Sequence, residues 1–70
     1  MSTEQYLERC KARAREHVLK GELRQAVAVM GMDLGRYPEL KPAPFLIELG
    51  LIAASCDDER GVRCWIEGFL

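Results

Sequence analysis

The stretch KGELRQAVAVMGMDLGRYPE, residues 20–39, decides the fold. Gly21 suits the left-handed conformation in which helices often end, and the Glu22 carboxylate favours the start of a new helix. Apolar residues then recur at intervals of three and four until Pro38, which forces the residue before it out of helical conformation. This pattern predicts the second helix of an antiparallel pair, whose apolar stripe is Leu23, Ala26, Val27, Met30 and Leu34.

The residues before this stretch predict the first helix of the pair. Ser2 or Thr3 can cap a helix, and Gln5 stands three residues after Ser2 as in a capping box. We expect this helix to run to about Leu19, since residues suited to a buried face recur at helical spacing, namely Leu7, Cys10, Ala14, His17 and Val18.

The second half of the chain predicts two further helices. A connection over residues 38–43 leads to a helix starting at Ala43 or Pro44, where proline is tolerated because its missing N–H costs nothing. The run FLIELGLI, residues 45–52, has almost no polar face, so a buried strand remains the alternative there. Residues 57–59 are acidic and favour the start of a last helix, with apolar positions at Val62, Trp65, Ile66 and Phe69.

A weak internal repeat supports the count of four helices. At an offset of thirty-five, Gly21 falls on Cys56, Met30 on Trp65 and Leu34 on Phe69. We therefore predict one all-α domain over residues 1–70, built as two helical hairpins. The first half resembles a tetratricopeptide unit, with matching residues at Ala14, Gly21, Ala26, Met30 and Pro38 and departures at Cys10, Arg13, His17 and Asp33.

A second resemblance covers more of the chain. The segments YLERCKARA (6–14), GELRQAVAVMGMDLGRYPE (21–39) and IEGF (66–69) are similar to small uncharacterised proteins of tailed bacteriophages and prophages. Residues 41–61 depart most from that pattern. The resemblance implies a phage or prophage source and an action on a host component, without an established activity.

The composition of the chain indicates where in the cell the protein acts. The formal charge of −1 gives no global attraction to nucleic acid or anionic lipid. The N-terminal sequence lacks the apolar stretch of a signal peptide, and the longest apolar run, residues 44–54, is far shorter than the ~20 residues of a membrane span. We expect a cytoplasmic protein without membrane contact, whose three cysteines are reduced and packed as small apolar side chains.

The sequence gives little support for a catalytic site or a metal-binding site. Cys10 and His17 lie on one helical face, and Cys56 or Cys64 could join them around zinc, but no close CxxC or HxxxH pair is present. A Cys10–His17 nucleophilic dyad would lack a cleft and oxyanion donors in helical hairpins. We predict no enzymatic activity, no catalytic residues, no metal and no cofactor.

Two surfaces are candidates for binding. Trp65, Phe69 and Leu70 form an apolar patch that serves either as a protein interface, including a homodimer contact, or as part of the core. A basic face at Arg9, Arg13, Lys20 and Arg24 is suited to phosphates, although glutamates interrupt it. The leading hypothesis is a small protein–protein interaction module, a phage accessory protein that binds a host protein. The alternative is a small nucleic-acid-associated or transcriptional regulator that uses the basic face.

Overall fold

The computed structural model describes residues 2–69. Within that range the chain forms four helices and no strand, so the all-α prediction is confirmed and the strand alternative over residues 45–52 is wrong. The helices are α1 (Thr3–Leu19), α2 (Leu23–Leu34), α3 (Pro44–Ser55) and α4 (Glu59–Glu67).

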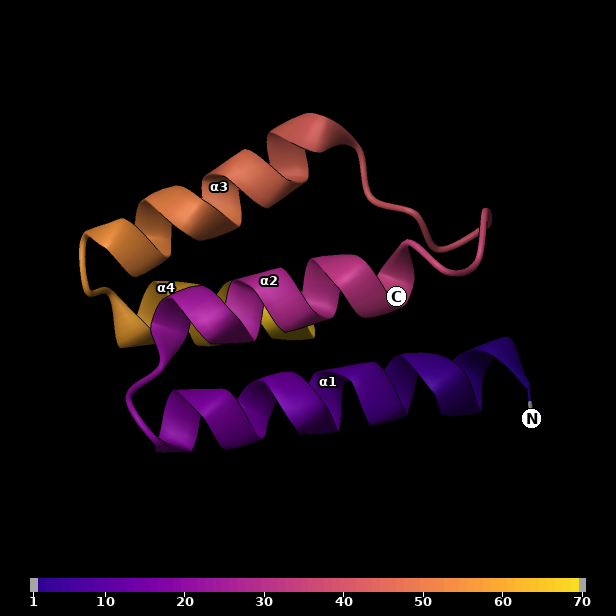
Figure 1. Ribbon diagram of the computed structural model, residues 1–70, viewed down its shortest axis with the longest axis horizontal. Helices are drawn as coiled ribbons and strands as arrows, with labels where there is room; N and C mark the ends of the chain where they lie inside the picture. The colour runs from indigo at the N-terminus through magenta and orange to yellow at the C-terminus, as the bar shows by residue number, and fades with distance from the viewer. Residues whose placement is uncertain (1, 70) are drawn as a thin grey trace.

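The helices are arranged as two hairpins around a shared centre. Figure 1 shows α1 and α2 lying antiparallel, α4 behind α2, and α3 on the far side of α2 from α1. Over the described residues, α4 contacts the other three helices, whereas α3 contacts α2 and α4 but not α1. Because α4 folds back onto α1, the arrangement is a closed bundle rather than an open stack of repeats, and the tetratricopeptide likeness holds only loosely.

The predicted signals at the start of α1 and at the α1–α2 turn are present. Ser2 Oγ accepts a hydrogen bond from the Gln5 backbone and the Gln5 side chain accepts one from the Ser2 backbone, which completes the capping box. Gly21 has a φ of 77°, and the Glu22 N–H donates to the His17 carbonyl at 2.8 Å. The last turn of α2 differs slightly from expectation. The helix ends at Leu34, before Pro38, because the Arg36 and Tyr37 amides donate to carbonyls three residues back, at 3.3 Å each, instead of four.

The α3–α4 turn repeats this geometry with an aspartate in place of glycine. Asp57 has a φ of 57°, and the Asp58 N–H donates to the Ala53 carbonyl at 3.0 Å, as Glu22 does to His17. Gly21 therefore corresponds to Asp57, an offset of thirty-six, and the predicted offset of thirty-five was wrong by one residue. The corrected register aligns Met30 with Ile66, and both are fully buried.

The core lies between the α1–α2 hairpin and α4. Apolar side chains from these three helices fill it, and α3 contributes only Ala54. The largest fully buried side chains are Met30, Leu34, Ile66, Val27, Val62 and Cys10.

No helix of the described chain is both long and apolar enough to cross a membrane.

Gly50 sets the position of α3. A Cβ at this residue would lie 2.7 Å from Trp65 Cε2 and 2.9 Å from Val27 Cγ1. Both distances are shorter than a carbon–carbon contact allows, so α3 can approach α2 and α4 this closely only without a side chain at residue 50.

Gly50→Ala should therefore destabilise the fold, by about 2 kcal/mol, because the new methyl group meets the rigid Trp65 ring. Gly31→Ala is the matched control, since its Cβ meets only the flexible end of Ile47 and gains helix propensity. Chemical denaturation of both variants measures the difference. Equal stabilities would show that Gly50 does not fix α3.

Asp57→Gly should stabilise the chain by about 0.5–1 kcal/mol, because glycine adopts a positive φ without the steric penalty that aspartate pays. Gly21→Ala should have the opposite sign at the equivalent turn. Thermal unfolding followed by circular dichroism tests both, and a loss of stability in Asp57→Gly would contradict the assignment.

Candidate protein-binding surface

The outward side of α3 is apolar and uncovered. Of its twelve residues only Gly50 and Ala54 are buried. Phe45, Leu49 and Ile52 are 61%, 53% and 59% exposed and recur at the i, i+4, i+7 spacing of one helix face. We call these three residues the α3 ridge.

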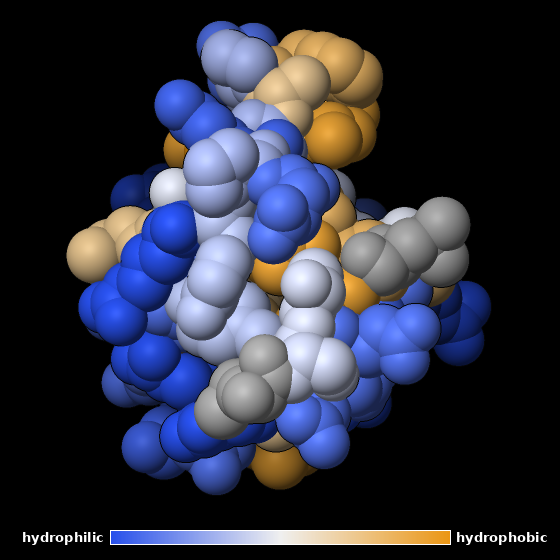
Figure 2. Space-filling view, turned by 90° about the vertical axis from the view of Figure 1, so that its right-hand side faces the viewer, coloured by the Kyte–Doolittle hydropathy of each residue, from blue (hydrophilic) through white to orange (hydrophobic). Residues whose placement is uncertain are grey.

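A groove runs beside the ridge, between α2 and α3, and we call it the α2–α3 groove. Its volume is about 460 Å³, and Lys41 is its only charged lining residue. In Figure 2, apolar surface lies on the right side of the top of the molecule, where α3 lies, beside hydrophilic side chains on the left, while the lower part over α1 is mostly hydrophilic. The other lining residues are Val27, Ala28, Gly31, Met32, Gly35, Pro42, Pro44, Ile47 and Leu51.

This surface is unusual because of the sequence of α3. A helix that is apolar on nearly every side belongs in an interior, yet α3 packs only through the side that carries Gly50. Covering a half-exposed Leu, Ile or Phe is favourable by roughly 1 kcal/mol. Covering the ridge would therefore be favourable, and the single chain leaves it uncovered. The near-absence of polar residues in 45–52 was the sequence signal for this surface, although the same pattern also fits a fully buried segment.

The predicted patch at the C-terminal end is drawn mainly into contacts within the chain. Trp65 is half-buried, its Nε1 donates to the Leu46 carbonyl at 2.7 Å, and its ring meets Phe69 edge to face at 4.9 Å between centroids. Leu70 lies outside the described residues. Trp65 therefore joins α4 to α3, and a small groove remains open beside it, lined by Leu46, Cys64, Trp65, Gly68 and Phe69.

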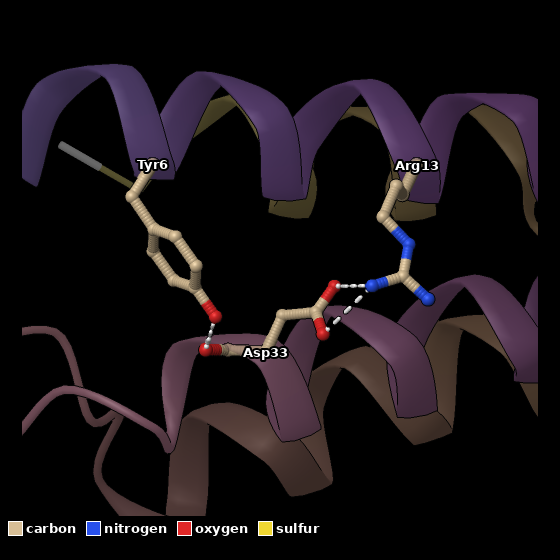
Figure 3. Close-up of polar contacts among 3 residues, drawn as sticks. All are labelled: Tyr6, Arg13 and Asp33. Atoms are coloured by element: carbon tan, nitrogen blue, oxygen red, sulfur yellow. Dashed lines mark hydrogen bonds and ion pairs between the residues drawn. The ribbon is translucent and has the colours of Figure 1, made fainter. Parts of the chain in front are cut away.

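The basic face of α1 is partly neutralised by α2. Arg13 Nη1 donates to both carboxylate oxygens of Asp33, at 2.9 and 3.0 Å, and Tyr6 Oη donates to the Asp33 carbonyl at 2.6 Å. Figure 3 shows both side chains reaching from α1 to this one residue of α2. The Asp33 side chain is only 7% exposed, so Arg13 balances a buried charge. Burial raises the pKa of the Tyr6 hydroxyl, which stays a donor.

Glu67 of α4 accepts hydrogen bonds from two more basic residues of α1. Arg15 donates to both of its carboxylate oxygens, at 2.6 and 2.8 Å, and Lys11 Nζ lies 3.5 Å from its backbone carbonyl. The hydrogen bonds from Arg15 lower the pKa of the Glu67 carboxyl. The contribution of this pair to stability is therefore complete above the ordinary Glu pKa and is lost as the pH falls through the lowered value.

The remaining predicted basic residues do not converge on one site. Arg9 and Arg13 lie one turn apart on α1, Lys20 caps its C-terminal end, and Arg24 lies in the first turn of α2. All four are exposed. Arg13 is paired with Asp33, which partly balances its charge, while its side chain stays exposed.

The cysteines and the histidine are placed apart. Cys10 is buried, and burial raises the pKa of its thiol, whereas Cys56 and Cys64 are exposed. The prediction that all three pack as core side chains was wrong for these two, because both lie on outward faces. His17 Nδ1 lies 2.8 Å from Glu22 Oε1. Within residues 2–69, no three His, Cys, Asp or Glu side chains gather closely enough to hold a metal ion.

Comparisons with protein-family models, with curated proteins and with solved structures find no match to this chain. The candidate surface therefore rests on the geometry of the described residues.

Arg13→Ala should destabilise the chain by about 1–3 kcal/mol, because it leaves the buried Asp33 carboxylate without its ion pair. Arg15→Ala is the matched control on the same helix, and it should cost less than about 1 kcal/mol because both members of the Arg15–Glu67 pair are solvated. Urea denaturation measures both. Equal losses would show that Asp33 does not depend on Arg13.

Proposed function

We propose that this protein is a non-enzymatic protein-binding module that works through the α3 ridge and the α2–α3 groove. The observation that carries the proposal is that α3 is apolar on nearly all sides and covered on only one. Exposed contiguous apolar surfaces on small soluble domains mark sites where another protein binds.

The shape and charge of this surface favour a protein over other ligands. The ridge is convex, so a small molecule cannot cover it, and the i, i+4, i+7 anchors suit helix-to-helix packing. Nucleic acid would require several cations, and the groove offers only Lys41. The basic face of α1 remains the alternative for nucleic acid, but its Arg13 is engaged by Asp33.

The biological setting in this proposal is a phage or prophage accessory protein acting in the host cytoplasm on a host protein. It is supported by the likeness of residues 6–14, 21–39 and 66–69 to small phage proteins. The segment 21–39 includes the α2 wall of the groove, whereas the α3 ridge lies within residues 41–61, which depart most from that pattern.

Capture of partners from a bacterial lysate with the tagged chain tests the proposal. Leu49→Glu places a charge at the centre of the ridge and should reduce recovery of bound protein at least tenfold. Leu19→Glu is the matched control, because Leu19 is 76% exposed on α1, which does not touch α3. The chain itself, carrying a different tag, is included as a potential partner.

Recovery of the same proteins by wild type and Leu49→Glu would contradict the assignment of the surface. Loss of recovery with Leu19→Glu alone would point to α1 instead. Circular dichroism confirms that each variant keeps its helices.

A further inference from the structure

We propose that the protein bound by this surface is a second copy of the same chain, in a two-fold symmetric dimer. This inference rests on the proposed function and names the partner. Each α3 ridge would lie in the α2–α3 groove of the other copy, so that the two α3 helices pack against each other.

The first argument is that one surface carries both halves of a helix-in-groove contact. The anchors are Phe45, Leu49 and Ile52, and the groove opens between α3 and α2 immediately beside them. A symmetric dimer requires a surface that complements itself, because the same residues meet across the two-fold axis. A ridge next to a groove of matching apolar character meets that requirement.

The groove also allows close approach. Ala28, Gly31 and Gly35 lie along one face of α2 and form its wall, and they leave space where larger side chains would fill it. Met32, on the same wall, is 72% exposed and is left without cover in a single chain. A helix entering from a second copy would cover it.

The second argument is charge. Lys41 lines the groove, and Glu48 lies on α3 between two groove residues, Pro44 four positions before it and Leu51 three positions after it. Over residues 2–69, neither Lys41 nor Glu48 takes part in an ion pair or a side-chain hydrogen bond. The surface thus carries one uncommitted charge of each sign. A second copy supplies both opposite charges by symmetry, whereas an unrelated helix would need to match each one.

The composition of the core gives a third reason. Here the core is filled by α1, α2 and α4, and α3 adds one buried apolar side chain, Ala54. Pairing α3 with its copy provides the helix with the interior that its sequence fits.

Sedimentation velocity and light scattering over a concentration series, with reductant present, test the dimer. Reductant is needed because Cys56 and Cys64 are exposed and can form disulfides between molecules. Wild type should reach twice the chain mass of 7.9 kDa. Leu49→Glu should weaken association at least about 100-fold, because it would bury an unpaired carboxylate in each of the two apolar grooves. Leu19→Glu should associate like wild type.

A charge exchange tests the pairing without touching the apolar residues. Glu48→Lys and Lys41→Glu should each weaken the dimer, because each replaces attraction by repulsion at two symmetric positions. The double variant, Lys41→Glu with Glu48→Lys, should restore association to within a few-fold of wild type. Both residues are exposed, so these variants are expected to fold, and circular dichroism verifies it.

Two outcomes overturn the inference. One is a monomer at every concentration in reductant. The other is a dimer that Leu49→Glu leaves intact or that the double charge variant fails to restore. A monomeric chain that still captures a different protein in a Leu49-dependent way would refute the dimer and leave the proposed function standing. A monomer that captures nothing would refute both.

Discussion

The absence of a side chain at residue 50 determines where α3 lies. Gly50 lets the backbone of α3 approach Val27 of α2 and the Trp65 ring of α4 more closely than any other residue would allow. The contact is close but narrow, since only Gly50 and Ala54 of α3 are buried by it. Because α3 approaches along this single line, its opposite side is held away from the rest of the chain. The exposed ridge is therefore a direct result of the close contact at Gly50.

Two carboxylates bind the basic side chains of α1. Asp33 and Glu67 each receive basic side chains from α1, and these pairs tie α1 to α2 and to α4. The Arg13–Asp33 pair is the more important of the two, because its carboxylate is buried. The basic segment of the chain thus stabilises the fold, while the α2–α3 groove is lined mainly by apolar residues, with Lys41 in its wall. These roles separate the part of the molecule that maintains the bundle from the part available to a partner.

Local chemistry made much of the fold predictable. The capping box at Ser2 and Gln5, the left-handed turn at Gly21 and the proline that starts α3 depend on neighbouring residues, and each lies where the sequence indicates. Features that depend on distant residues were harder to predict. The residue equivalent to Gly21 is an aspartate, so the repeat was misplaced by one position. The exposure of Cys56 and Cys64 depends on which faces α3 and α4 turn outward.

The candidate surface depends partly on local sequence and partly on contacts between distant residues. The spacing of Phe45, Leu49 and Ile52 is visible in the sequence, and so is the lack of a polar face on that helix. The sequence did not show which face of α3 would be left uncovered. That face is decided by the packing of Gly50 against Val27 of α2 and Trp65 of α4. The predicted patch at Trp65 was identified from its aromatic residues, but the bond from Nε1 to the Leu46 carbonyl uses much of it inside the chain.

The order of the helices has a consequence for biosynthesis. The ribosome releases α1 and α2 first, and their hairpin can close on its own contacts, including the Arg13–Asp33 pair. When α3 follows, it is apolar on nearly every side and can pack only against α2 until α4, which carries Trp65, has been synthesised. During that interval the nascent chain exposes more apolar helix than at any later time, and this is when it most needs a chaperone to prevent aggregation.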